Sequence, residues 1–178
     1  MRLRDATEAD IAAITAIYND VILTSDAIWL DEIVTVDDRL DWFRQQQADG
    51  GVVLVAVDDA LDDEGDGGDR VVGYASLGRF RTKTGYWPTV EHSIHLADGY
   101  RGQGIGQALL DELVARATAQ GRYVMVAGVD AGNVGSIRFH ERNGFRIVAT
   151  MPAVGRKFGC PVDLILMQRE LRTPGDPA

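Results

Sequence analysis

The stretch "GYRGQGIGQALL", residues 99–110, places glycines at positions 102, 104 and 106, directly before an apolar pattern typical of a helix. Glycine weakens a helix, so three glycines at a helix start need a reason. Main-chain N–H groups left uncovered in such a turn, together with the helix dipole, favour a bound anion. We therefore interpret this stretch as an anion-binding turn made of Arg101, Gly102, Gln103, Gly104, Ile105, Gly106 and Gln107.

Three known patterns of phosphate-binding turn can be compared with this stretch. A dinucleotide fingerprint needs G-x-G-x-x-G, but the third position is Gln107, and only 72 residues follow Gly106, which is short for a doubly wound sheet. A P-loop needs lysine and serine or threonine after the last glycine, and the chain reads "IGQALL". The third pattern, R/Q-x-x-G-x-G/A, is a diphosphate turn for coenzyme A, and Arg101, Gly104 and Gly106 fill it. A merely flexible strand–helix turn is the alternative.

The hydrophobic pattern around this turn predicts one α/β (α+β) domain over residues 1–171, followed by a disordered tail at 172–178. The expected order is β-α-α-β-β-β-α-β-α-β-β, a mixed sheet flanked by helices. Thr7 and Asp10 predict a capping box for the first helix. A loop with a short extended piece is expected at 25–35, and a second helix at 36–47 with Val36, Leu40 and Phe43 inward. The expected strands are 2–7, 51–57, 71–78, 89–96, 123–129, 145–151 and 162–171, and the later helices are 104–120 and 135–144.

Charge and composition narrow the classes of partner. The net charge of the 178 residues is −9, but residues 58–69 hold seven acids and no base, which leaves −9 + 7 = −2 elsewhere. This distribution argues against nucleic acid, which needs a basic surface. No membrane segment or signal peptide is expected. The single cysteine, Cys160, favours a reduced cytoplasmic setting, and the three histidines are not spaced as metal ligands, so no metal is expected.

The turn and a second motif, "N-x-x-S-x-x-F-H-E-R-N-G-F" over 133–145, resemble the GNAT superfamily of N-acetyltransferases. Further stretches, including "TVEHSIHL" and "MPAVGRKFGCPVDLILMQ", are similar to the phosphinothricin and methionine sulfoximine N-acetyltransferases, and the likeness covers residues 2–171. The resemblance implies acetyl-CoA as co-substrate, a small amino acid as acceptor and a homodimer. The acidic loop formed by residues 58–69 is longer than in that family, and "TKTGYWP" (82–88) differs in detail.

Two residues are candidate catalytic groups. Strand alternation in "TVEHSIHL" puts Glu91 with Ser93 and His95 on one face and His92 on the other, where we expect it to pack in the core. An amine must lose a proton before it attacks a thioester, and the resemblance gives this position a substrate-side glutamate, which makes Glu91 the candidate base, acting directly or through water. His140 stands where many superfamily members have a tyrosine that protonates the thiolate. The alternatives are a solvated strand glutamate and a surface histidine.

The resemblance also implies which residues contact the cofactor. The backbone of Ile94, His95 and Leu96 is expected to pair with the pantetheine amides as an added strand, and an N–H there would stabilise the oxyanion. Asn133 and Ser136 are expected near the cofactor, and helix capping is their alternative role.

The acceptor side is expected to combine cations with aromatic walls. Cations near the site suit a carboxylate and side-chain oxygens through charge-assisted hydrogen bonds, whereas the aromatic residues have core packing as their alternative role. The candidate substrate-binding residues are Trp29, Phe80, Arg81, Lys83, Thr84, Gly85, Tyr86, Glu91, Lys157 and Phe158.

The sequence thus predicts an acetyl-CoA-dependent N-acetyltransferase for a small methionine-like amino acid, such as methionine sulfoximine, methionine sulfone or phosphinothricin. Acetylation of a peptide or protein N-terminus is the first alternative. A non-catalytic acyl-CoA-binding module is the second, and the presence of both Glu91 and His140 argues mildly against it.

Overall fold

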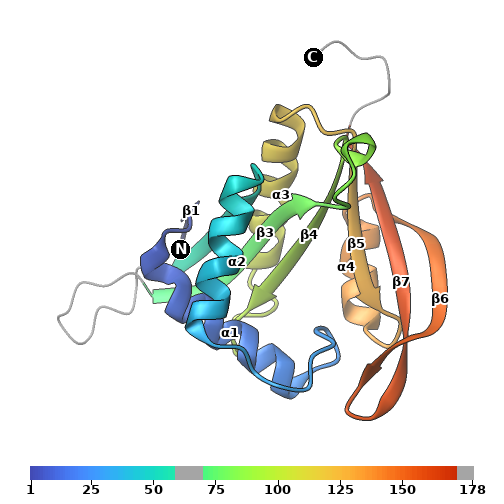
Figure 1. Cartoon of the computed structure of the whole chain (residues 1–178), viewed down its shortest axis with the longest axis horizontal. Helices are drawn as coiled ribbons and strands as arrows, with labels where there is room; N and C mark the ends of the chain where they lie inside the picture. The colour runs from blue at the N-terminus through green and yellow to red at the C-terminus, as the bar shows by residue number, and fades with distance from the viewer. Residues whose placement is uncertain (59–69, 172–178) are drawn as a thin grey trace.

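The strands form a single mixed sheet of seven, in the order β1-β2-β3-β4-β5-β7-β6 (Figure 1). The computed structural model describes residues 1–58 and 70–171, so the acidic loop beyond Asp58 and the tail at 172–178 lie outside the described residues. Neighbouring strands are antiparallel except β4 and β5, which are parallel. The strands are β1 (Arg2–Asp5), β2 (Val52–Asp58), β3 (Arg70–Arg79), β4 (Thr89–Leu96), β5 (Val124–Asp130), β6 (Arg146–Lys157) and β7 (Cys160–Glu170).

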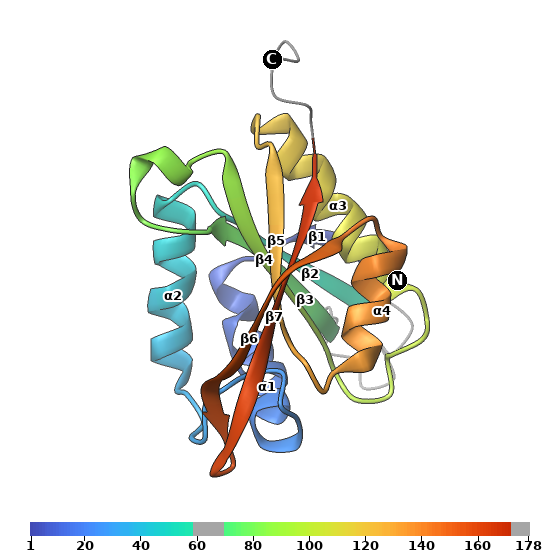
Figure 2. The same ribbon diagram turned by 90° about the vertical axis from the view of Figure 1, so that its right-hand side faces the viewer.

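Helices cover both faces of the sheet, α1 and α2 on one side and α3 and α4 on the other (Figure 2). Each pair closes its own apolar core: Leu109 and Leu113 of α3 are fully buried on one face, and Ile14 of α1 and Phe43 of α2 on the other. The element order confirms the predicted one. The helices are α1 (Ile11–Thr24), α2 (Val36–Ala48), α3 (Ile105–Ala119) and α4 (Val134–Arg142), with 3₁₀ turns η1 (Glu8–Asp10) and η2 (Thr84–Tyr86). None of the described helices is long and apolar enough to span a membrane.

Local signals explain where the N-terminal helices begin. The Thr7 N–H donates to Asp10 Oδ2 at 2.7 Å, which is the predicted capping box, although a 3₁₀ turn precedes α1. The α2 helix begins with a similar box, in which Thr35 Oγ1 accepts from the Asp38 N–H at 3.1 Å. One expectation was wrong: Val36 is exposed, because it lies in the first turn of α2, ahead of the residues that face the core. Residues 25–35 form a loop, as expected, and its end residues Ser25 and Thr35 have extended backbone.

The β4 and β5 strands pair only where they begin. Their register joins Thr89–Glu91 to Val124–Val126, and no pairing follows. Beyond that point β4 stays paired with β3 and β5 with β7 over their full lengths, so the two halves of the twisted sheet diverge. The gap is visible between the two arrows in Figure 1 and leaves the β5-facing edge of β4 free from His92 onward.

The β6–β7 hairpin is longer than predicted. It turns at Phe158 and Gly159, both at positive φ, and its register slips between Met151 and Gly155, where Ala153 also has positive φ. Alternation is lost at this bulge, which explains why the pattern underestimated the strands. Much of the outer hairpin surface is apolar and exposed, with Ile147, Val148, Met151, Val154 and Phe158 among the exposed large side chains.

Candidate active site

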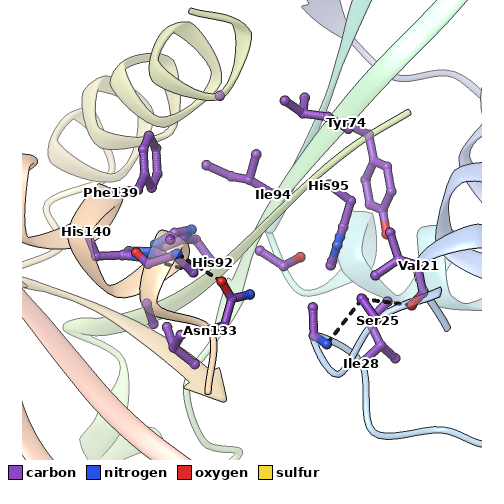
Figure 3. Close-up of a pocket in the computed structure, with 18 of the residues that line it drawn as sticks. Val21, Ser25, Ile28, Tyr74, His92, Ile94, His95, Asn133, Phe139 and His140 are labelled. Carbon is purple, nitrogen blue, oxygen red and sulfur yellow. Dashed lines mark hydrogen bonds between the residues drawn. The ribbon is translucent and has the colours of Figure 1, made fainter. Parts of the chain in front are cut away.

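A cavity of about 830 Å³ is lined by both strands of the gap. In Figure 3, Ile94 of β4 lies between two groups of lining side chains. His92, Asn133, Phe139 and His140 form one group, and Val21, Ser25, Ile28, Tyr74 and His95 form the other. Three arginines, Arg39, Arg101 and Arg142, line this cavity against one carboxylate, Asp130, so its lining is cationic although the chain is acidic.

The glycine-rich turn ends at the cavity with its amides uncovered. Gly102 and Gly104 have φ of +78° and +81°, which an L side chain rarely adopts, and a Cβ on either would meet nothing within 4 Å. Gly104 is the N-cap residue of α3, and no side chain caps this helix. The first-turn N–H groups therefore keep their hydrogen-bonding capacity for a ligand, and the helix dipole makes an anion the favoured one.

The structure brings most of the predicted cofactor residues to this cavity. Two of the predicted residues do not line it: Ile105 is buried in the core, and the Gln103 side chain donates to the Gly99 carbonyl at 2.9 Å. The residues that line it are Ile94, His95, Leu96, Arg101, Gly102, Gly104, Gly106, Gln107, Asn133 and Ser136. Asn133 also performs its alternative role, since its Oδ1 accepts from the Ser136 N–H at 3.0 Å and caps α4.

Glu91 lies beside the cavity rather than in its wall. A Cβ on the cavity residue Gly128 would lie 3.5 Å from Glu91 Oε1. Burial raises the pKa of the Glu91 carboxyl, and the nearby charge of Arg81 acts in the opposite direction. A carboxylate whose pKa is raised toward neutrality is a stronger base, which suits the role predicted for this residue.

His140 is buried, so the surface-histidine alternative was wrong. Its Nδ1 lies 2.7 Å from the Ser136 carbonyl oxygen. A carbonyl only accepts, so the neutral ring carries its proton on Nδ1 and leaves a lone pair on Nε2. Burial lowers the pKa of His140, although the Ser136 hydrogen bond opposes this shift, and Nε2 is enclosed without a partner among the described residues. At neutral pH the ring is therefore neutral, and its free lone pair lies on the enclosed Nε2.

His92 packs as predicted, on the opposite face from Glu91. Its ring lies 5.2 Å from that of His140 and 5.4 Å from that of Phe145. Burial, together with His140 and His95, lowers the pKa of His92 to about 3, so the ring stays neutral.

The predicted acceptor-side residues lie apart from the cavity in the single chain. Phe80 and Arg81 stack on each other, with the guanidinium 3.9 Å from the ring centroid, and neither lines it. Trp29 contacts the hairpin at Gly155 and lines a smaller pocket of about 220 Å³. The other members, Lys83, Thr84, Gly85, Tyr86 and Phe158, are exposed.

Lys157 is a correction to the predicted anion-binding set. Its side chain is fully buried, and Nζ donates to the Ile22 carbonyl at 2.6 Å and to the Leu30 carbonyl. These contacts attach the β6–β7 hairpin to the C-terminal end of α1 and to the following loop. The ammonium that was expected to bind a substrate carboxylate instead donates hydrogen bonds to two main-chain carbonyl oxygens.

The aromatic group around Arg39 was not predicted from the sequence. This side chain is only 7% exposed, and its guanidinium lies 3.6 Å from the ring centroid of Trp42 and 4.1 Å from that of Tyr18. Tyr74 is fully buried beside it and packs against His95. The only available signal was an arginine at a buried position of a helical pattern, which is indistinguishable from a surface arginine without the partners that surround it.

A mixed sheet split between two parallel strands, with an uncapped glycine turn where the gap ends, is the arrangement of a coenzyme A-dependent acyltransferase. Comparison with known proteins agrees: residues 14–145 match the acetyltransferase (GNAT) family, and the chain belongs to this family. Among residues 1–58 and 70–171, no group of three or more His, Cys, Asp or Glu side chains is arranged to hold a metal ion.

Relatives with assigned names span nearly the whole chain. An L-methionine sulfoximine/L-methionine sulfone acetyltransferase from Salmonella typhimurium is 43% identical over 96% of this chain and 95% of its own. A phosphinothricin acetyltransferase from Sinorhizobium meliloti, solved in complex with AcCoA, has a TM-score of 0.90 at 35% identity, covering 99% of this chain and 91% of that one. A ribosomal-protein-alanine N-acetyltransferase from Brucella melitensis has a TM-score of 0.87 at 40% identity, with 96% and 99% covered.

Proposed function

We propose that this chain transfers the acetyl group of acetyl-CoA to the α-amine of a small methionine-like amino acid, such as methionine sulfoximine, methionine sulfone or phosphinothricin. The observation that carries the proposal is the β4–β5 gap, which ends at the uncapped N-terminus of α3. The gap fits an extended, amide-containing chain, and the turn fits its diphosphate. The names of the methionine sulfoximine and phosphinothricin relatives support the choice of acceptor.

The chain's own groups suffice for the proton transfers. Glu91 takes a proton from the substrate ammonium, and the free amine forms a C–N bond to the thioester carbonyl carbon. An N–H of Ile94, His95 or Leu96 stabilises the oxyanion. His140 lines the cavity, and its Nε2 is an acceptor that is enclosed in the free chain. Once the bound thioester gives access to Nε2, it takes the second proton from the attacking nitrogen and returns it to the sulfur as the C–S bond breaks.

A second candidate is acetylation of a protein N-terminus, which the name of the Brucella melitensis structure favours. Thiol release should be measured with methionine sulfone, methionine sulfoximine, phosphinothricin and an alanine-initiated peptide as acceptors. We expect turnover with the free amino acids and little with the peptide. Preference for the peptide would support the second candidate. Binding of coenzyme A without turnover of any amine would identify the chain as a binding module.

We further propose that the chain forms a homodimer in the cytoplasm. The exposed apolar side chains of the β6–β7 hairpin, including Ile147, Met151 and Phe158, are the surface that would be covered. Sedimentation analysis tests the assembly. Substitution of Met151 and Phe158 by serine should shift a dimer toward monomer.

A further inference from the structure

Arg39 is a buried cation that the proposed mechanism does not use. It lines the cavity from α2, and its pKa is lowered by burial, with only the tyrosines Tyr74 and Tyr18 acting to raise it. Among residues 1–58 and 70–171, no carboxylate forms an ion pair with it and no atom accepts a hydrogen bond from its guanidinium. A charge removed from water without an ionic partner is costly, so its presence needs an explanation.

Aromatic stacking compensates only the faces of this guanidinium. The rings of Trp42 and Tyr18 lie within 3.6 and 4.1 Å of its central carbon, which is the geometry of cation–π attraction. The five N–H donors lie in the guanidinium plane and are not satisfied by those rings. Nε is enclosed without an acceptor, whereas the terminal nitrogens are not enclosed and belong to a side chain that lines the cavity.

Tyr74 supplies a second unpartnered donor in the same place. Its ring centroid lies 5.9 Å from the central carbon of the Arg39 guanidinium, and its hydroxyl is buried with no partner among the described residues. In Figure 3 this hydroxyl points to the region of Val21 and Ser25, on the α1–α2 side of β4. Burial raises the pKa of Tyr74, so the hydroxyl keeps its proton and remains a donor.

The group around Arg39 lies on the same face of β4 as Glu91, because its neighbour His95 is four residues further along that strand. The His95 ring packs against both Tyr18 and Tyr74, and Ser93 lies on the same face of β4. At about 3.3 Å per residue along a strand, His95 is roughly 7 Å beyond Ser93 and about 13 Å beyond Glu91. The cavity is continuous over this distance, because Arg39, Ser93 and Gly128 all line it.

We propose that Arg39, assisted by the Tyr74 hydroxyl, binds an oxygen-centred anionic or strongly polar group of the amino-acid acceptor. This inference rests on the proposed function and makes Arg39 a specificity-determining residue of the same site. Two groups of such an acceptor have the required chemistry: the α-carboxylate and the side-chain sulfone, sulfoximine or phosphinate oxygens. Both match the planar, paired donors of an arginine.

The substitution Arg39→Met tests the proposal, because methionine keeps much of the apolar stem and removes the donors. We expect KM for methionine sulfone to rise by about 10- to 100-fold, as for the loss of a hydrogen bond between charged groups, while KM for acetyl-CoA is unchanged. Arg44→Met is the matched control, since Arg44 lies on the same helix, is exposed and pairs with Glu8. An unchanged KM for the acceptor, or a rise confined to acetyl-CoA, would refute the proposal.

Stability separates this role from a structural one. A purely structural Arg39 would make Arg39→Met unfold at lower temperature with KM unaffected. A ligand-binding cation that is unpaired in the free protein predicts equal or higher thermal stability of the variant. Tyr74→Phe provides a second test that preserves the packing of the ring, and we expect a smaller rise in acceptor KM.

Two further comparisons identify the bound group and keep the two hypotheses apart. If Arg39 binds the carboxylate, its loss penalises methionine sulfone but not methionine sulfone amide. If it binds the side-chain oxygens, its loss penalises methionine sulfone but not norleucine.

Calorimetric titration of methionine sulfone into the coenzyme A-bound protein reports binding without turnover. Binding that depends on Arg39 without acetylation would refute the proposed function alone, and acetylation insensitive to Arg39 would refute this inference alone.

Discussion

Replacing Gly104 with alanine, and comparing it with the same change at Gly99, tests whether the glycine-rich turn binds a diphosphate. The two glycines have nearly equal φ, +81° and +80°, and a Cβ on either meets nothing within 4 Å. Each substitution should therefore cost the same 1–2 kcal/mol or so for a left-handed L residue. This corresponds to roughly 2–8 °C in melting temperature for a domain of this size. Of these two glycines, Gly104 lines the cavity and Gly99 does not, so a Cβ added at Gly104 would meet a bound ligand and one added at Gly99 would not.

The assay is calorimetric titration of coenzyme A, with thermal unfolding of the free protein as the check on folding. Gly104→Ala should weaken coenzyme A binding by about 10- to 100-fold, the loss expected when a charge-assisted hydrogen bond is displaced. Gly99→Ala should lower the melting temperature by the same amount and leave the affinity for coenzyme A unchanged. Equal affinities in the two variants would show that the glycines serve the fold alone, and the diphosphate turn would have to be abandoned.

The remaining predictions concern Glu91 and Lys157. Because burial raises the pKa of Glu91, kcat/KM should increase with pH through a value above the usual carboxyl range, and Glu91→Gln should abolish that limb. The same shift means that ionised Glu91 destabilises the fold near neutral pH, so Glu91→Gln should melt at a higher temperature. Lys157→Met should lower the unfolding free energy by about 2–4 kcal/mol, because the Ile22 and Leu30 carbonyls lose their donor. Lys83→Met, at an exposed lysine, should change stability little, and an equal loss there would contradict this reasoning.

The parts of the site that sequence alone predicted are those encoded by local pattern. The capping box of Thr7 and Asp10 needs only residues three apart, and the glycines of the turn need only their own backbone. Alternation in β4 placed Glu91 and His92 on opposite faces correctly. In each case the physical cause lies within one turn or one strand of the residue concerned.

The parts that sequence missed depend on residues far apart in the chain. Lys157 contacts Ile22, which is 135 positions away, so its burial cannot be inferred from its neighbours. The aromatic rings around Arg39 come from Tyr18 of α1 and Tyr74 of β3 as well as from Trp42 of its own helix. A basic residue is normally assigned to the surface, and only tertiary packing reverses that assignment.

The divergence of β4 from β5 also has a kinetic consequence. The free β4 edge and the amides before α3 are features of the folded sheet. The parts of coenzyme A that we propose they bind do not change when the acetyl group leaves. Under the proposed function, the spent carrier should therefore occupy the site about as firmly as the loaded one. Product inhibition competitive with acetyl-CoA follows, and discrimination between acyl groups is left to the immediate surroundings of Glu91 and His140.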